Sequence, residues 1–196
     1  MGEMFRLDVA DADQRNPYQL RPTRRAPGNV PYIVDNLWEW RRPHKMPSRR
    51  HCVCVSPHPE LAARAGGTPG GRVFRVEVSG ARMAQIPQYD AREHPDVVGE
   101  RSLTRFILRL LGQDWLDGPA ETKMPEALLW TPCLAQAEVE KVFISERLVS
   151  VRDHVWDTIH FWNDARSIMS GSEWPFPDGE IFFEAKSWML LPTDPA

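Results

Sequence analysis

Three polar residues, Arg6, Ser56 and Glu126, have side-chain types and local settings suited to chemistry on a phosphate-bearing substrate. Arg6 stands in the alternating stretch MFRLD, where its guanidinium either binds phosphate through a rigid fork of donors or stays solvated at a sheet edge. Ser56 ends the stretch HCVCVS, so its hydroxyl either binds a ligand or caps the following helix. Glu126 begins the apolar stretch EALLWT, as a positioned acid–base group or as an exposed acid at a strand start.

Hydrophobic periodicity predicts the elements that position these residues. Strands are expected over 3–11, 51–56, 68–80, 126–131, 139–151 and 180–191, and helices over 35–42, 59–65, 99–116 and 151–169. The strongest helical pattern is 99–116, where apolar residues recur at helical spacing and arginines 101, 105 and 109 lie opposite. The stretch up to about Pro31 is rich in proline and arginine and indicates a surface loop. A run of strands separated from the helices favours an α+β fold over a doubly wound parallel sheet.

The composition indicates one domain in a reducing compartment. A chain of 196 residues with 42% hydrophobic content can bury a single good core. The net charge of -3 gives no overall attraction to nucleic acid or anionic membranes, although basic clusters at 21–25 and 41–50 could form local patches. We find no secretory or membrane-spanning pattern, so a cytoplasmic location is expected.

Metal and redox chemistry have little support in the sequence. The three cysteines include no CxxC pair, and Cys52 and Cys54 are expected to be small buried groups. The six histidines form no HExxH motif, so no metal is expected. The glycines between 66 and 71 precede a strand instead of opening a helix after one, which indicates a turn and not a phosphate-binding loop.

The order of three segments resembles the catalytic elements of the ADP-ribosyltransferase superfamily. MFRLD is similar to its opening YR-D strand, and CVCVSPHPELAARA is similar to its serine strand and alanine-bearing helix. PEALLWTPCLAQAEVEKVF is similar to its E-V-L strand, short loop and following strand. The resemblance covers about residues 3–150 and points to the branch that uses an arginine, a serine and a glutamate.

This resemblance implies a split, two-sheet α+β fold that holds NAD, as a substrate, in the cleft between the sheets. Residues 1–150 would form the core of a single domain over 1–196, and 151–196 would be a C-terminal helix–strand extension. Arg6 would bind the phosphates, Ser56 would bind the ribose next to nicotinamide, and Glu126 would accept a hydrogen bond from a ribose hydroxyl.

The chain also departs from the pattern of the family. Pro57 and His58 follow Ser56 where the family usually has another hydroxyl, which leaves His58 as the candidate for that cofactor contact. Met124 stands two residues before Glu126, where arginine-modifying members have Glu or Gln, so an arginine acceptor is not favoured. The loop that recognises the target in the family would present Glu121, Lys123 and Met124 to the substrate.

Two functions from different classes follow. The first is an NAD-dependent mono-ADP-ribosyltransferase, of the kind found among bacterial toxins and effectors, or an NAD hydrolase. Its acceptor would be another residue type, a nucleic acid, a small molecule or water. The second is a non-catalytic interaction module, of the inhibitor or immunity type, that binds a protein partner through an exposed aromatic patch around Trp174 and Trp188.

Overall fold

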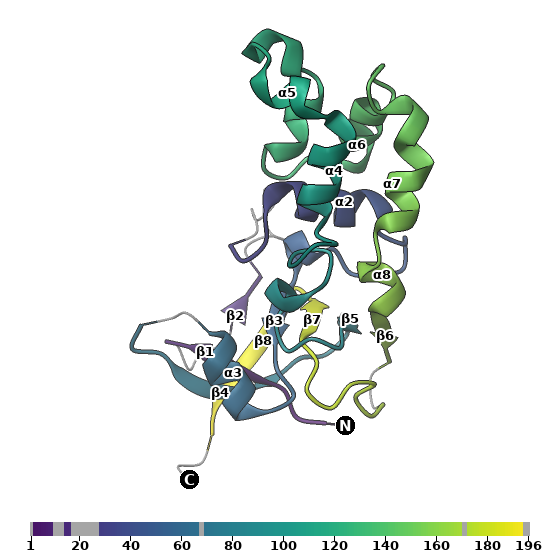
Figure 1. The fold of residues 1–196 in the computed structure, drawn as a ribbon. Helices are drawn as coiled ribbons and strands as arrows, with labels where there is room; N and C mark the ends of the chain where they lie inside the picture. Colours follow the sequence, from purple (N-terminus) through teal and green to yellow (C-terminus); the bar gives the residue numbers. More distant parts are fainter. Residues whose placement is uncertain (1, 10–13, 17–27, 67–68, 170–171, 194–196) are drawn as a thin grey trace. The chain divides into compact units, whose positions relative to one another are not determined.

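The computed structural model describes residues 2–9, 14–16, 28–66, 69–169 and 172–193, and the chain forms two compact units (Figure 1). Unit 1 comprises Met1–Arg25, His44–Ala91 and Asp164–Ala196. Unit 2 comprises Ala26–Pro43 and Arg92–Asn163. The prediction of a single domain divided at residue 150 stays a prediction.

Unit 1 contains two antiparallel four-stranded sheets, in agreement with the predicted α+β class. The first has the order β1-β4-β8-β2, and its strands are Phe5–Asp8, Arg72–Glu77, Ser187–Pro192 and Gln14–Arg15. The second has the order β3-β7-β5-β6, and its strands are Val53–Val55, Ile181–Glu184, Arg82–Gln85 and Arg166–Ile168. A single bridge between Phe5 and Ser56 joins β1 to the end of β3, so the two sheets meet there.

Side chains from both sheets form one hydrophobic core. Its buried members are Met4, Val53, Val55, Phe74, Val76, Met83, Ile168, Ile181, Phe183, Ala185, Trp188 and Leu190. Several recur at every second position of a strand, because alternate side chains of a strand point to the same face. Burial of this set supplies the main favourable free energy for unit 1.

The short helix α3, Pro59–Ala65, packs on β1 and β4 (Figure 1). Pro59 is its first residue, where the missing N–H costs nothing. The helix ends at Gly66, and a β-carbon there would lie 2.5 Å from Cβ of Leu7. Only glycine allows the chain to pass so close to β1, which explains the change from alanines to glycine at this point of the sequence.

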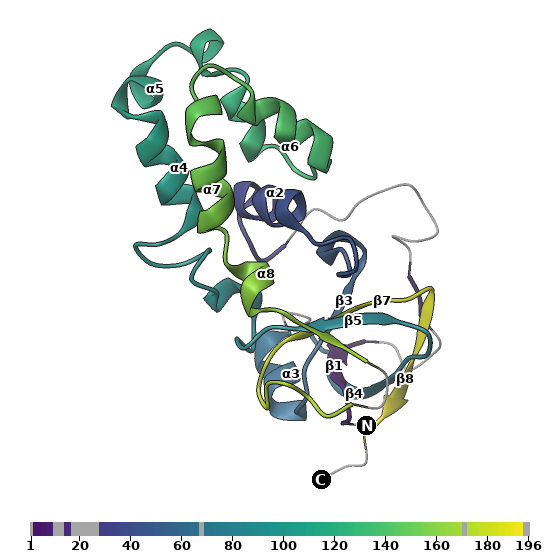
Figure 2. The ribbon, with the colours of Figure 1, turned by 90° about the vertical axis from the view of Figure 1, so that its right-hand side faces the viewer.

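Unit 2 is helical in its described residues (Figure 2). Its α-helices are α2 Tyr32–Arg41, α4 Leu103–Leu111, α5 Gln113–Asp117, α6 Gln136–Phe143, α7 Arg152–Thr158 and α8 Phe161–Asp164, the last of which runs one residue into unit 1. Short 3-10 helices cover η3 Ala120–Lys123, η4 Glu126–Trp130 and η5 Val149–Val151. None of the helices in the described ranges is long and apolar enough to cross a membrane.

The core of unit 2 is organised around a buried carboxylate. Asp96 accepts hydrogen bonds from Nε1 of Trp38 at 2.9 Å and from the backbone N–H of Phe161 at 3.0 Å. The rings of Trp38 and Phe161 also stack, with centroids 4.0 Å apart. Asp96 therefore links α2 to the start of α8. It also accepts hydrogen bonds from two donors that would otherwise be buried without a partner.

The strands expected at 126–131 and 139–151 are absent, and both segments are helical. Glu126 begins η4 and not a strand. In α6, the buried residues are Val139, Val142 and Phe143, a spacing that fits one face of a helix. The prediction was wrong because it weighted the β-branched residues more than the period at which they recur.

Other boundaries also differ from the predictions. The helix expected at 99–116 breaks into α4 and α5 at Gly112, whose φ is 77°. The helix expected at 151–169 ends early, because its last residues form β6. The single strand expected at 180–191 is two strands, β7 and β8, and β5 was not predicted at all. The predicted loop before Pro31 includes β2, and its residues 17–27 lie outside the described residues.

Candidate functional site

The junction of β1 and β3 brings Arg6 and Ser56 together. Phe5 and Ser56 exchange two backbone hydrogen bonds, each with an N···O distance of 2.8 Å. The guanidinium of Arg6 reaches across to β3 and donates to the carbonyl oxygen of Cys54 at 2.9 Å. Two of the three residues expected to act together therefore lie on adjacent strands, although 50 residues separate them in the chain.

The two side chains differ in exposure. Arg6 also donates from Nε to Asp8 at 3.0 Å, and its side chain is 31% exposed, so an anion can still reach the guanidinium. Ser56 is buried, at 4% exposure. The residue that precedes α3 as its cap is His58, which makes no capping hydrogen bond, so capping does not account for Ser56.

A carboxylate outside the set predicted from the sequence, Glu180, immediately precedes β7. The antiparallel register of β3 and β7 ends with Val55 opposite Ile181, so Ser56 and Glu180 each lie one residue beyond the paired strands. The backbone of Glu180 bonds to Ile86 and Gln88, and that of Ser56 bonds to Phe5. The sequence signal was available, because Glu180 precedes the apolar stretch IFFEA as Glu126 precedes ALLW.

Glu180 is 5% exposed, and both of its carboxylate oxygens are bound. Oε1 forms an ion pair with the guanidinium of Arg49 at 3.1 Å, and Oε2 accepts from the backbone N–H of Ala91 at 2.5 Å. Arg49 is itself buried and lies 5.3 Å from the ring centre of Phe182. A buried charge pair of this kind fixes the carboxylate in one orientation.

The turn that leads into Glu180 is also held firmly. The fully buried amide of Gln85 donates to the carbonyl oxygens of Phe176 and Gly179 and accepts from the N–H of Phe176. A β-carbon at Gly179 would lie 2.0 Å from the carbonyl oxygen of Ile86, so only glycine fits there. The backbone before Glu180 therefore has little freedom to move.

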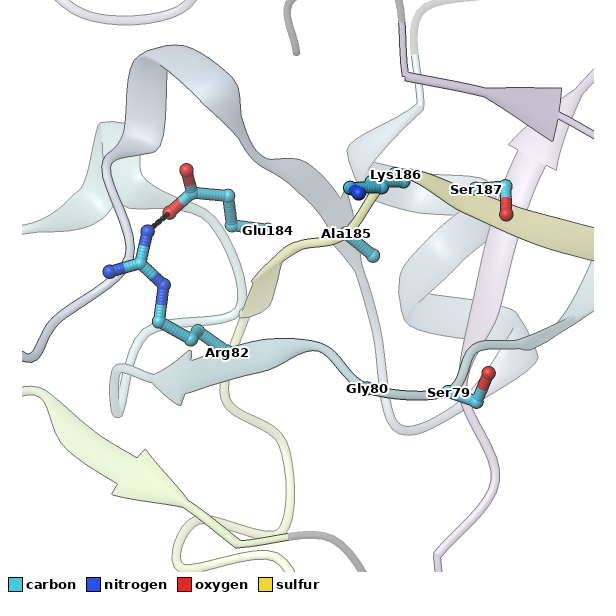
Figure 3. A pocket seen from close by; sticks show the side chains of 7 residues that line it. All are labelled: Ser79, Gly80, Arg82, Glu184, Ala185, Lys186 and Ser187. Atoms are coloured by element: carbon cyan, nitrogen blue, oxygen red, sulfur yellow. Dashed lines mark hydrogen bonds and ion pairs between the residues drawn. The ribbon is translucent and has the colours of Figure 1, made fainter.

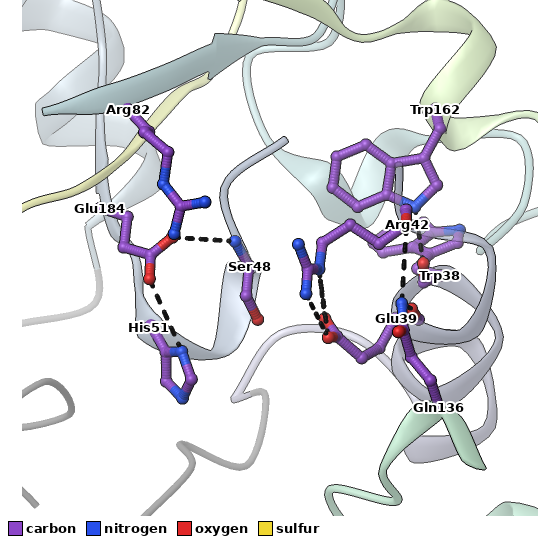
Figure 4. Close-up of polar contacts among 9 residues, drawn as sticks. All are labelled: Trp38, Glu39, Arg42, Ser48, His51, Arg82, Gln136, Trp162 and Glu184. Atoms are coloured by element: carbon purple, nitrogen blue, oxygen red, sulfur yellow. Dashed lines mark hydrogen bonds and ion pairs between the residues drawn. The ribbon is translucent and has the colours of Figure 1, made fainter. Parts of the chain in front are cut away.

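At the other end of β7, Glu184 lies in a separate polar cluster, shown among the contacts of Figure 4. It accepts from Arg82 at 2.6 Å and from the backbone N–H of Ser48 at 3.4 Å, and His51 lies 3.8 Å away. Burial alone would raise the pKa of Glu184, but the contacts with His51, Arg82 and Ser48 together lower it below its ordinary value. The carboxylate is therefore stabilised in its charged form.

Arg82 and Glu184 also line a small hollow of about 310 Å³, seen from close by in Figure 3. Its other walls are the turns at Ser79–Gly80 and Ala185–Ser187. The hollow is at the low end of the size range of small-molecule sites. Arg82 is already paired with Glu184, as Arg6 is with Asp8, and the side chain of Arg82 is 55% exposed against 31% for Arg6.

Glu126 lies in unit 2, whereas Arg6 and Ser56 lie in unit 1, so no compact unit contains all three. Glu126 is 2% exposed, and its Oε1 accepts from the hydroxyl of Ser145 at 2.7 Å. Within the described part of the chain its Oε2 has no hydrogen-bond partner. A buried carboxylate oxygen without a partner is uncommon in folded proteins.

The expected substrate-binding residues lie on or just after η3, in unit 2. Glu121 is exposed, and Met124 is 53% exposed. Lys123 donates to the carbonyl oxygen of Leu116 at 3.0 Å. His58, in unit 1, is half exposed and lies 3.6 Å from Asp178 in a surface ion pair, which contributes little stability.

Among the described residues, no group of His, Cys, Asp and Glu side chains is arranged to hold a metal ion, and the three cysteines form no disulfide. Unit 1 carries the guanidinium of Arg6 on β1, the hydroxyl of Ser56 just after β3 and the carboxylate of Glu180 just before β7. Comparisons of the chain with protein-family models, with curated proteins and with solved structures find no match.

Proposed function

We propose that the protein is an NAD-dependent mono-ADP-ribosyltransferase, or an NAD hydrolase, in which Glu180 has the role expected for Glu126. One observation carries the proposal: Arg6 lies on β1, Ser56 directly follows β3 and is bridged to β1 through Phe5, and Glu180 directly precedes β7, the neighbour of β3. These are the three residue types that the resemblance requires, in the same order along the chain. The ADP-ribosyltransferase-like core is part of this proposal.

In the proposed reaction, the bond between the ribose and nicotinamide breaks, and nicotinamide leaves with the bonding electron pair. The ribose ring develops oxocarbenium character, which a fixed carboxylate stabilises in a site with little water. Glu180 supplies that charge and accepts from a ribose hydroxyl, Ser56 binds the same ribose, and the exposed part of Arg6 binds the phosphates. An acceptor nucleophile, or water, then attacks the ribose carbon and loses a proton.

This mechanism requires Glu180 to change one of its hydrogen-bond partners. Its two oxygens are bound to Arg49 and Ala91, so one oxygen must exchange its present donor for the ribose hydroxyl when NAD binds. The acceptor also becomes an open question again. The argument against an arginine acceptor rested on Met124, but Asp178 is the residue two positions before Glu180.

The test measures nicotinamide released from NAD by the wild type and by two matched variants. Glu180→Gln keeps the shape of the side chain and removes its charge, and we expect the rate to fall by about 100-fold or more. Glu126→Gln makes the same change at a buried glutamate of unit 2, and we expect a rate close to that of the wild type. Circular dichroism and thermal unfolding establish that each variant is folded.

Two outcomes would contradict the proposal. No nicotinamide release by the wild type, with or without added cell lysate as a source of acceptor, would exclude the reaction. Loss of activity in Glu126→Gln with full activity in a folded Glu180→Gln would return the catalytic role to Glu126.

The alternative, a non-catalytic interaction module, finds no specific support in the C-terminal segment. The proposed aromatic patch needs exposed rings, but Trp188 is 8% exposed and belongs to the core of unit 1. Trp174 is partly buried and packs against the same core. A binding surface of the kind first considered would therefore have to lie elsewhere on the protein.

A further inference from the structure

The proposed reaction, on which this inference rests, leaves one proton without a receiver. The acceptor loses a proton when its nucleophilic atom attacks the ribose carbon. Arg6 is a cation, and the carboxylate oxygens of Glu180 are bound by Arg49 and Ala91. The hydroxyl of Ser56 carries its own proton and takes up no other at neutral pH. The reaction therefore needs a further group near these residues that can accept a proton.

A histidine connects the two segments that carry Ser56 and Glu180. His58 follows Ser56 by two residues, and Asp178 precedes Glu180 by two residues. Nε2 of His58 lies 3.6 Å from Oδ1 of Asp178, so the pair bridges the two segments. The side chains of His58 and Asp178 are 50% and 75% exposed, whereas Ser56 and Glu180 are buried. The pair is therefore open to solvent beside the buried residues, where an acceptor can approach.

The other histidines have different surroundings. His51 contacts Glu184, at the opposite end of β7 from Glu180. His44 is exposed and precedes β3 in the chain by several residues. The remaining three histidines belong to unit 2. Of the histidines in unit 1, His58 is the one in contact with the segment that leads into Glu180.

The contact with Asp178 suits His58 to act as a base. A carboxylate beside Nε2 favours the tautomer with its proton there, which leaves the lone pair of Nδ1 for an incoming proton. Among the described residues, the His58 ring has no hydrogen bond, ion pair or ring contact other than that with Asp178. The separation of 3.6 Å is longer than a hydrogen bond, and catalytic pairs often shorten when substrate binds.

We propose that His58, oriented by Asp178, removes the proton from the acceptor, and that the acceptor is a hydroxyl group or water. A lone pair of the acceptor oxygen forms the new bond to the ribose carbon, and the proton of that oxygen passes to Nδ1 of His58. Nicotinamide leaves with the electron pair of the bond that breaks. Asp178 stabilises the imidazolium that forms, and the exposed ring then returns the proton to water.

This base also limits the kind of acceptor. A guanidinium has a pKa above about 12, so an imidazole is too weak a base to deprotonate it. An arginine acceptor therefore does not fit the proposed role of His58.

The experiment measures nicotinamide release from NAD by the full chain in two media, buffer alone and buffer with sodium azide. Both contain dialysed cell lysate as a source of acceptors, and the release by lysate alone is subtracted. Azide ion attacks without losing a proton, so it needs no base. Without azide, we expect His58→Gln to lower the rate by about 100-fold. With azide, we expect the same variant to approach the wild-type rate.

Two further variants complete the comparison. His44→Gln makes the same change at another exposed histidine of unit 1, and we expect the wild-type rate in both media. Glu180→Gln should remain slow in both media, because cleavage of the bond to nicotinamide still requires its charge.

A folded His58→Gln with the full wild-type rate in the absence of azide would overturn this inference and leave the proposed function intact. A loss that azide does not restore would also overturn it, because a defect in NAD binding or in folding persists with azide. Absence of nicotinamide release by the wild type in both media would overturn the inference and the proposed function together.

Discussion

At the scale of single residues, a short segment before β3 contacts the carboxylates at both ends of β7: Glu180, just before the strand, and Glu184, its last residue. Arg49 pairs with Glu180, while Ser48 and His51 contact Glu184. Both carboxylates are buried, so each contact offsets a large cost of removing charge from water. The segment 48–51 therefore holds the carboxylates at both ends of β7.

The lowered pKa of Glu184 predicts a pH dependence of stability. Because the pKa is lower in the folded chain than the ordinary value of 4.5, the unfolded chain binds more protons between the two pKa values. The stability that Glu184 provides is complete above pH 4.5 and is lost as the pH falls through the folded pKa.

Urea unfolding between about pH 7 and pH 3 measures this effect in the wild type and in Glu184→Gln. We expect the wild type to lose more free energy of unfolding on acidification than the variant, which is already less stable at pH 7. Glu60→Gln, at an exposed position of α3, should follow the wild-type curve. Parallel curves for the wild type and Glu184→Gln would show that this carboxylate has no such role.

At the scale of elements, α4 has one buried and one exposed face. Its buried face, with Leu103 and Ile107 fully buried, holds the helix in unit 2. Its exposed face carries Arg105 and Arg109. The helix ends at Gly112, whose positive φ is unfavourable for other residues and redirects the chain into α5.

Shortening a fully buried or a partly buried side chain of α4 should therefore lower the free energy of unfolding by different amounts. Ile107→Ala leaves a cavity in a fully buried position, and we expect it to lower the free energy of unfolding by about 2–5 kcal/mol. Leu108→Ala, one residue further along and only partly buried, should cost clearly less. Chemical denaturation measures both values, and equal losses would mean that α4 is not packed as described.

At the scale of the whole molecule, the proposed NAD site lies within one of the two units. Unit 1 contains Arg6, Ser56 and Glu180, and unit 2 contains Glu126. Unit 2 is built from two separate stretches of the chain, so each of them leaves unit 1 and returns to it.

Binding of NAD should protect one unit selectively. We expect NAD at about 100 times its Kd to stabilise the folded state by about 2.7 kcal/mol. In hydrogen exchange, the added protection should appear in β1, β3 and β7 and not in α4, α6 and α7. Glu180→Gln allows the measurement without consumption of NAD. Equal protection of both units, or none, would contradict the assignment of the NAD site to unit 1.

Local sequence patterns correctly predicted the elements whose conformation is determined by residues close to them in the sequence. The alternating stretches around β1, β3 and β4, the proline-led start of α3 and the amphipathic face of α4 were all recognised. They also selected Arg6 and Ser56 as residues of interest. In each case the period of apolar residues and the adjacent proline or glycine determine the local conformation.

Tertiary structure decided which carboxylate lies in the same compact unit as these two residues. Glu126 and Glu180 both precede short apolar stretches, and no local pattern separates them. The difference arises because β7 pairs with β3 and the segment after Glu126 turns into helices, a choice made by what each apolar face packs against. Pairing between strands so distant in the chain depends on the shared core, and the sequence of either strand alone does not contain it.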